Sequence, residues 1–248
     1  FEEDSTFHGQ REDGTATRVK QIGRDFGVFR LLHEASGKGR RAFGFLSTIT
    51  SHPEDDAITQ GIDWHYRSPS SQFIWDGQLM YSDVDDTKGA GGFFDMNYIP
   101  KQGTLHRFSF DYLDDKLDIN DLGFIRRNDA ITYRYTYSLT NSKNPKFRLR
   151  NDNFTLSHET NTDGRMVRSS FYYRNTLTFH NRNQLNSTFI LRPEQWDDRK
   201  TEGNGEYKTH SGGIAEFAFG TDTSKQLSAS IATSVMTEQL GDLTYSAK

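Results

Sequence analysis

The stretch that decides the fold is ITYRYTYSL, residues 131–139, in which Ile131, three tyrosines and Leu139 occupy every second position. Threonine, arginine, threonine and serine fill the positions between them. Because a β-strand points successive side chains to opposite faces, this stretch would have one aromatic face and one polar face that carries Arg134. The ordinary interpretation is a half-buried strand of a soluble β-protein, so the rest of the chain has to be compared with it.

The same two-residue period recurs from about residue 27 to the end, whereas a helical period is nearly absent. The chain therefore belongs to the all-β class. We expect twelve strands, at about residues 27–35, 41–50, 58–68, 72–82, 92–100, 104–113, 129–140, 146–158, 165–180, 184–192, 207–220 and 225–236. Residues 16–24 and 243–248 could form further strands.

The connections between these strands alternate in length. Tight turns rich in Gly, Pro, Asn, Asp and Ser are expected at residues 36–40, 69–71, 101–103, 141–145, 181–183 and 221–224. Mostly longer, more acidic connections lie between them: SHPEDDA, SDVDDTKGAGG, LDDKLDINDLGFIRRN, ETNTDG and RPEQWDDRKTEGNGE. Outer-membrane barrels have short periplasmic turns, longer extracellular loops and strands of about 9–11 residues. A soluble sandwich usually has shorter strands and Greek-key connections. The pattern favours an antiparallel up-and-down transmembrane β-barrel of at least 12 strands.

The composition agrees with a barrel that has a water-filled lumen. Only 33% of the residues are hydrophobic and the mean hydropathy is -0.81, yet aromatic residues make up 13%. Such a barrel faces lipid with every second residue only, so its average hydropathy stays polar. No apolar run is long enough for a transmembrane helix. The net charge of -4 gives no reason to expect nucleic acid as a partner, and the absence of cysteine excludes disulfides and thiolate metal sites.

Four segments resemble a known family. They are GRDFGVF (23–29), TQGIDWHYRSPSSQFIWDGQLMYS (59–82), DINDLGFIRRND (118–129) and FEEDSTF (1–7). They are similar to an uncharacterised barrel domain that follows a family-9-type carbohydrate-binding module in many Gram-negative outer-membrane proteins. The resemblance implies a barrel in the bacterial outer membrane and no catalytic residue. The module itself is not in this chain, so sugar binding is not carried over to any residue. We expect one barrel domain over residues 1–248, as a fragment of a longer chain.

The alternation divides the candidate residues between two environments. Polar side chains that would line or plug the lumen are Asp63, His65, Arg67, Asp76, Asp95, Arg134, Arg168, Arg174, His180 and Glu216. Rings of charge there would tune which solutes pass. Opposite charges could also pair across the lumen and simply satisfy one another, and both interpretations can hold together. Aromatic side chains that would face lipid as interface girdles are Trp64, Tyr66, Trp75, Tyr81, Tyr98, Tyr133, Tyr135, Tyr137 and Tyr173. Trp196, in the loop EQWDD, is kept as a possible ligand contact.

Two kinds of chemistry remain possible in the loops. Acidic pairs together with His52, His158 and His210 could activate water if the loops converge; the pairs are Asp55 with Asp56, Asp85 with Asp86, Asp114 with Asp115, and Asp197 with Asp198. The runs SDVDDTKG and DDKLDIND could hold calcium, although neither has EF-hand spacing. In both cases the simpler interpretation is solvated surface charge.

We therefore expect a non-enzymatic outer-membrane protein, either a passive channel or a scaffold for a surface or periplasmic assembly. Its partners would be outer-membrane lipid, lipopolysaccharide, and possibly a protein that fills the lumen. Two alternatives stay open: an outer-membrane hydrolase with loop-borne Asp and His residues, and a soluble β-structured carbohydrate-binding protein.

Overall fold

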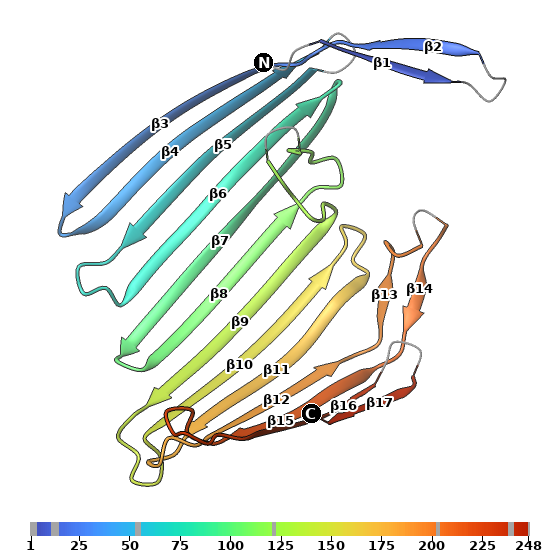
Figure 1. Cartoon of the computed structure of the whole chain (residues 1–248). Coiled ribbons are helices and arrows are strands. Elements are labelled where there is room, and N and C mark those ends of the chain that lie inside the picture. Colours follow the sequence, from blue (N-terminus) through green and yellow to red (C-terminus); the bar gives the residue numbers. More distant parts are fainter. Residues whose placement is uncertain are drawn as a thin grey trace.

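A computed structural model describes residues 4–10, 15–52, 56–120, 123–201, 204–237 and 241–247 of the chain. Seventeen strands and no helix lie in these residues, and thirteen of the strands form one antiparallel sheet (Figure 1). Its strands are β3 (Asp25–Gly37), β4 (Gly39–Ser51), β5 (Asp56–Arg67), β6 (Phe73–Val84), β7 (Thr87–Lys101), β8 (Thr104–Leu113), β9 (Ala130–Asn141), β10 (Leu149–Thr160), β11 (Met166–Thr178), β12 (Gln184–Arg192), β15 (Gly212–Gly220), β16 (Ser230–Thr237) and β17 (Leu243–Ala247).

Each strand of this sheet pairs with the next one along the chain, so the topology is a plain up-and-down meander. Two hairpins lie outside the sheet. The first, β1 (Ser5–Gln10) with β2 (Ala16–Gln21), precedes the sheet. The second, β13 (Gln195–Asp197) with β14 (Tyr207–Thr209), is inserted between β12 and β15. The all-β class and the meander predicted from the sequence are confirmed.

Most predicted strands are present with shifted ends. One predicted connection and two predicted strands differ from the structure. The connection SDVDDTKGAGG is not a long loop, because β6 and β7 continue to a two-residue turn in which Asp85 and Asp86 have φ of 48° and 63°. The predicted strand 207–220 is two strands, β14 and β15. The strand expected at 225–236 begins only at Ser230. Long connections therefore occur mainly at 114–129 and 193–211, and part of FEEDSTF, residues 1–3, lies outside the described residues.

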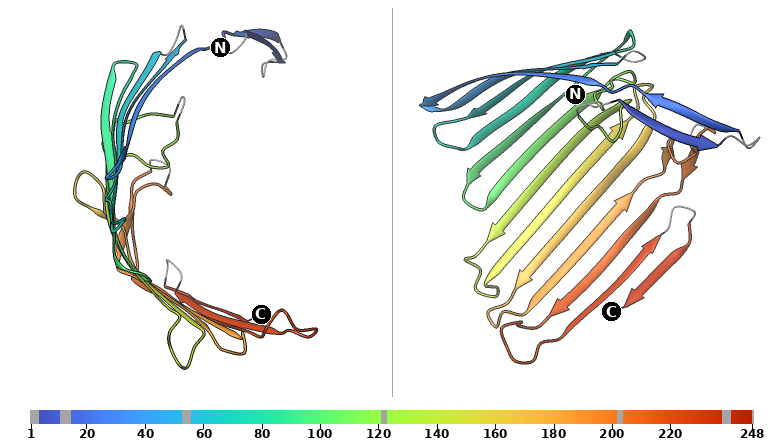
Figure 2. Two further views of the ribbon diagram at one scale, coloured as in Figure 1. Left: turned by 90° about the vertical axis from the view of Figure 1, so that its left-hand side faces the viewer. Right: turned by 45° about the horizontal axis from the view of Figure 1, so that its top comes forward.

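The sheet curves into an open arc (Figure 2). Within the described residues β3 and β17 are its two edges, and neither pairs with the other. The closed barrel predicted from the sequence is thus not observed. What the structure has is a strongly bent antiparallel wall with a concave side and a convex side.

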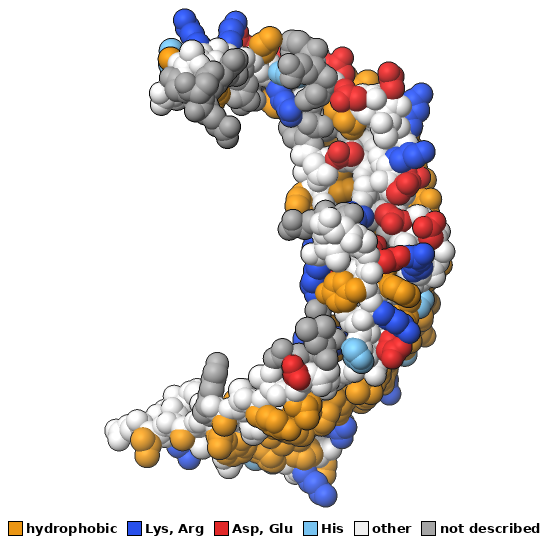
Figure 3. Space-filling model, turned by 90° about the vertical axis from the view of Figure 1, so that its right-hand side faces the viewer, with side chains coloured by type: hydrophobic (Ala, Val, Ile, Leu, Met, Phe, Trp, Pro, Cys, Tyr) orange, Lys and Arg blue, Asp and Glu red, His pale blue; other side chains and the backbone are white. Residues whose placement is uncertain are grey.

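The two faces of this wall differ in polarity. We call the face that carries Arg134 the polar face and the face that carries Tyr135 the apolar face. The connection 114–129 and the β13–β14 hairpin both contact side chains of the polar face and reach into the hollow of the arc, so the polar face is concave (Figure 2). Hydrophobic side chains gather on the convex side, most densely over one limb of the arc (Figure 3).

The wall has almost no core. Only Ala57, Leu117, Ala130 and Val167 are buried hydrophobic residues among those described. The accessible surface is 16707 Å², whereas a compact monomer of this mass would have about 11,000 Å². The apolar side chains that would fill a soluble core must therefore lie on the surface.

Those side chains lie on the apolar face. Apart from Phe26, Val28 and Leu32 on the edge strand β3, every large hydrophobic side chain exposed on the thirteen-stranded sheet belongs to the apolar face by register. Leu79 and Leu191, for example, are 59% and 62% exposed. No second sheet covers this face in the described part of the chain, so the soluble sandwich expected from ITYRYTYSL alone is not formed.

Rings on the apolar face form a continuous row, which we call the aromatic belt. Its members lie on β6 to β12 and on β15, and each ring contacts the next at centroid distances of 4.6 to 6.2 Å. The belt consists of Phe73, Tyr98, His106, Tyr137, Phe154, Tyr173, Phe189 and Phe217. Such ring pairs add about 0.5–1.5 kcal/mol each beyond area burial.

The described residues include no helix with the length and apolarity to cross a membrane.

Candidate functional site

The polar face collects the side chains that the sequence pattern assigns to a lumen. Nine of the ten lie on it, because the cross-strand register assigns each of them to the same face as Arg134. The tenth, His180, lies beyond the end of β11 in the turn that leads to β12, where its Nε2 is 3.1 Å from the carbonyl oxygen of Pro145. All nine aromatic residues expected to face lipid lie on the opposite, apolar face.

Acidic side chains dominate the polar face of β5 to β8. Asp63 accepts two hydrogen bonds from the Arg30 guanidinium, at 2.5 and 3.0 Å. Asp76 lies 2.5 Å from Nδ1 of His65 and, on its other side, directly opposite Asp95. Asp111 lies on the same face of β8. Two of these four carboxylates thus have a local basic partner, and Asp95 and Asp111 have no salt bridge among the described residues.

Basic side chains dominate the polar face of β9 to β11. Arg134, Arg168 and Arg174 project there, and none of them forms a salt bridge with a described carboxylate. Arg174 instead lies over the ring of Tyr172, at 5.9 Å. Asp63 and Asp76 therefore have local basic partners, whereas Asp95, Asp111 and these three arginines form no salt bridge among the described residues. Arg67 and Arg107 lie on the polar face of β5 and β8, so both signs of charge occur on that stretch of the arc.

The connection 114–129 lies against the polar face. Its Leu117 is completely buried over β7, where Gly89 and Gly91 leave the space that a side chain would fill. A Cβ atom on Gly89 would lie 2.3 Å from the backbone nitrogen of Leu117. The backbone N–H of Asp118 also donates to Oγ of Ser82 on β6, at 3.0 Å. This connection is thus anchored inside the arc and narrows the hollow.

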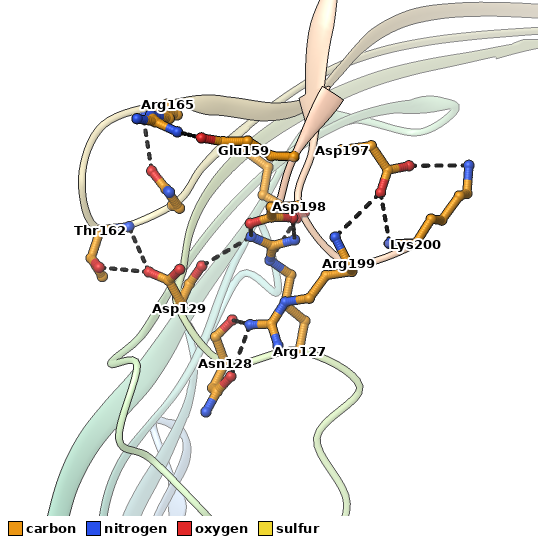
Figure 4. Close-up of polar contacts among 12 residues, drawn as sticks. Arg127, Asn128, Asp129, Glu159, Thr162, Arg165, Asp197, Asp198, Arg199 and Lys200 are labelled. Carbon is orange, nitrogen blue, oxygen red and sulfur yellow. Dashed lines mark hydrogen bonds and ion pairs between the residues drawn. The ribbon is translucent and has the colours of Figure 1, made fainter. Parts of the chain in front are cut away.

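The far end of this connection is tied to the β13–β14 hairpin by Arg127 (Figure 4). Arg127 donates to both carboxylate oxygens of Asp198, at 2.8 and 2.7 Å, and its Nε lies 3.8 Å from Oε1 of Glu159 on β10. The Arg127 hydrogen bonds hold the pKa of Asp198 below its usual value, against the opposing effect of burial. The pair is mostly buried, with side-chain exposures of 14% and 19%, so this cross-link is stronger than a surface ion pair.

Further polar contacts complete the cross-link between the connections (Figure 4). Arg199 donates to the backbone carbonyl and to Oδ1 of Asn128, at 3.3 and 3.1 Å. Asp129 accepts from the backbone N–H and the hydroxyl of Thr162 in the β10–β11 turn. Asp197 accepts from the backbone N–H groups of Arg199 and Lys200 and pairs with the Lys200 ammonium at 3.1 Å. Three separate connections therefore form one network at this end of the arc.

A polar pocket of about 460 Å³ lies between the hairpin and the polar face of β10 and β11. Its walls include Arg168 from the sheet, Arg126 and Arg127 from the connection, and Trp196 from β13. Trp196 was the loop aromatic singled out as a possible ligand contact, and the guanidinium of Arg165 lies 5.7 Å above its ring. The volume is within the range of small-molecule sites.

Of the residues considered for loop chemistry, Asp56 lies beside Asp85 and His52: its backbone N–H donates to Oδ1 of Asp85 at 3.1 Å, and its Oδ1 accepts from the backbone N–H of His52 at 3.3 Å. Asp85 and Asp86 form the tight turn between β6 and β7, and Asp197 and Asp198 are engaged by Lys200 and Arg127. Among the described residues no three His, Asp or Glu side chains gather as they would around a metal ion. Asp55 and Asp121, which belong to the acidic runs, lie outside the described residues.

Sequence reasoning did not identify the network around Arg127. The segment GFIRRND contains it, but the partner Asp198 is 71 residues away and has no local signal. Leu117 was likewise missed, since a lone apolar residue in an acidic connection does not reveal which glycines it covers.

Comparison with curated proteins and with solved structures gave no match. A family model described as "Domain of unknown function (DUF5916)" matches residues 46–246, from β4 to β17, and therefore most of the curved sheet and both connections of the site. This match covers more than half of the chain and includes the whole of the pocket, so the chain belongs to the DUF5916 family.

Proposed function

We propose that this chain forms the wall of an outer-membrane β-barrel whose polar lumen lets solutes pass by diffusion, without chemistry. The observation that carries the proposal is the uncovered apolar face. Large hydrophobic side chains are exposed on it on every strand from β4 to β12, whereas the opposite face carries charged and polar groups. Lipid outside and water inside satisfy both faces at once.

The aromatic belt supports the same arrangement. Rings at one level of many neighbouring strands are typical of the girdle at a membrane interface, where an aromatic body meets lipid and a polar tip meets water. Four of the eight members have such a polar tip: Tyr98, His106, Tyr137 and Tyr173. His106 hydrogen-bonds the hydroxyl of Tyr135 at 2.8 Å, which leaves fewer polar groups unsatisfied beside lipid.

Membrane insertion also requires that the edges of the sheet be paired. Unpaired backbone groups cannot remain in hydrocarbon, so β3 and β17 need partner strands to complete a barrel. The proposal therefore includes closure of this arc by additional pairing, with outer-membrane lipid and lipopolysaccharide as neighbours of the apolar face. The anchored connection 114–129 would then narrow the lumen from inside.

The test is electrophoretic mobility of the detergent-extracted full-length protein, loaded with and without boiling. A closed barrel keeps its compact form in the detergent of the gel until it is heated, so two bands of different mobility are expected. A single band at both temperatures, together with extraction into buffer without detergent, would contradict the proposal.

Conductance in planar bilayers then separates the open channel from a closed scaffold. Discrete current steps would support diffusion through the lumen, and their absence would overturn the proposed channel.

A further inference from the structure

We infer that the pocket beneath the β13–β14 hairpin is a binding site for small solutes that carry carboxylate or phosphate groups. This inference deepens the proposed function by naming the class of solute. Binding itself requires only the pocket and would persist if the lumen did not conduct. The argument rests on the balance of charge among the residues that line the pocket.

The three carboxylates of the pocket share two basic partners, Arg127 and Lys200. Asp198 forms two hydrogen bonds with Arg127, and Asp197 pairs with Lys200 and accepts two backbone hydrogen bonds. Glu159 lies 3.8 Å from Nε of Arg127 and accepts from the Thr132 hydroxyl at 3.5 Å. The six basic residues that line the pocket therefore outnumber its three carboxylates, and each carboxylate has a basic partner within 3.8 Å.

Four guanidinium groups remain. Arg126, Arg168, Arg192 and Arg199 line the pocket, and none of them forms a salt bridge with a described carboxylate. Arg199 and Arg192 donate to neutral oxygens instead, those of Asn128 and Thr237. Arginine stays charged at every physiological pH and binds carboxylate or phosphate oxygens in pairs. The pocket thus has an excess of positive charge and the donors that an anion requires.

The position of these arginines is fixed by three independent elements. Arg168 comes from β11, Arg192 from the end of β12, and Arg126 from the connection that Arg127 ties to the hairpin. Hydrogen bonds to Thr237 and Asn128 hold the guanidinium groups of Arg192 and Arg199 in place before a ligand arrives. Such preorganisation lowers the cost of binding.

Trp196 adds a ring surface beside the charged groups. It lines the same pocket, and a volume of about 460 Å³ accommodates a molecule of monosaccharide size. A ring-shaped solute with one acidic group would contact both Trp196 and the arginines. A neutral ring would lose the charge-assisted hydrogen bonds.

The experiment measures the fluorescence of the folded protein in detergent during titration with glucuronate, with inorganic phosphate and with glucose. Glucuronate and phosphate are expected to bind, and glucose is expected to bind at least about tenfold more weakly. Trp196→Phe should remove the fluorescence change, because the other two tryptophans, Trp64 and Trp75, lie on the apolar face. Rising salt should weaken the binding.

Two substitutions test the assignment of residues. Arg168→Gln should weaken binding of both anions by roughly tenfold or more. Arg126→Gln, at an exposed position of the connection 114–129, should also weaken it. The matched control is Arg174→Gln, which removes the same group from the same strand outside the pocket. Equal affinity for glucose and glucuronate, or equal loss in Arg174→Gln, would overturn the inference. Anion binding without conductance would refute the channel and leave the site intact.

Discussion

Replacement of Leu79 by arginine distinguishes a lipid-facing surface from a wet one. Leu79 lies in the middle of β6 with 59% of its side chain exposed, and Ile62 and Gly92 are its neighbours on the apolar face. If that face were in water, the substitution would change stability by no more than about 0.5 kcal/mol, because it removes little packing. If the face lies in hydrocarbon, an arginine near the midplane costs about 2–4 kcal/mol.

The magnitude is large enough to measure. A loss of 2–4 kcal/mol lowers the ratio of folded to unfolded protein by roughly 30- to 700-fold. The adjacent Gln78→Arg substitution is the control, because Gln78 points to the polar face, where an added guanidinium remains in water near Asp63. The two variants differ only in the face that receives the charge.

The assay is urea titration of each protein folded into vesicles of a short-chain phosphatidylcholine, with the heat-dependent gel shift as the measure of folding. Leu79→Arg should unfold at a clearly lower urea concentration than the parent protein, and Gln78→Arg should unfold within about 0.5 kcal/mol of it. If both variants unfold with the parent protein, or if both lose the same stability, the apolar face is not in lipid and the reasoning fails.

Three further predictions concern the connections across the polar face. Gly89→Val should detach the connection 114–129, since a Cβ at that position would lie 2.3 Å from the backbone of Leu117. Faster hydrogen exchange around Leu117 would show the detachment. The control is Gly220→Ala, where a Cβ meets nothing within 4 Å. The stabilisation from the pair of Asp198 and Arg127 should be complete above the ordinary carboxyl pKa of 3.8 and should be lost as the pH falls below it through the lowered pKa of Asp198. Protection of the amide hydrogens of the β13–β14 hairpin, taken relative to the intrinsic exchange rate at each pH, should therefore fall only below pH 3.8. A loss of protection between neutral pH and 3.8 would contradict the assignment. Removal of divalent cations by a chelator should leave the thermal unfolding temperature in detergent unchanged, because Asp197 and Asp198 at the cross-linked connections are engaged by Lys200 and Arg127, and a marked decrease would reveal a metal site there.

The strands were predictable because their signal is local. Alternation in ITYRYTYSL specifies a strand with two different faces, and the same rule places Trp75, Tyr98 and Tyr173 on one side of the sheet. Since the side-chain period of a strand is two, a strand that keeps its alternation also keeps its face. The up-and-down order followed from the tight turns, which join only antiparallel neighbours.

The connections were predicted less well, for two different reasons. The charge of the run around Asp85 and Asp86 predicts a long loop, but two residues with positive φ complete a hairpin whatever their charge. A second error concerns residues 193–211, where the predicted loop contains the β13–β14 hairpin, which folds back over the polar face. Its position depends on contacts with residues far away in the chain.

The sequence by itself determined the strands, the order in which they pair and the face on which each side chain lies, because all three follow from the two-residue period and the turns. The tertiary structure decided the curvature of the sheet, the open arc between β3 and β17, and the pocket at Arg168. The pocket is formed where Arg127 meets Asp198, across 71 residues of sequence, and the connection 114–129 is anchored where Leu117 covers Gly89. Such contacts depend on three-dimensional proximity, for which the alternating pattern contains no signal.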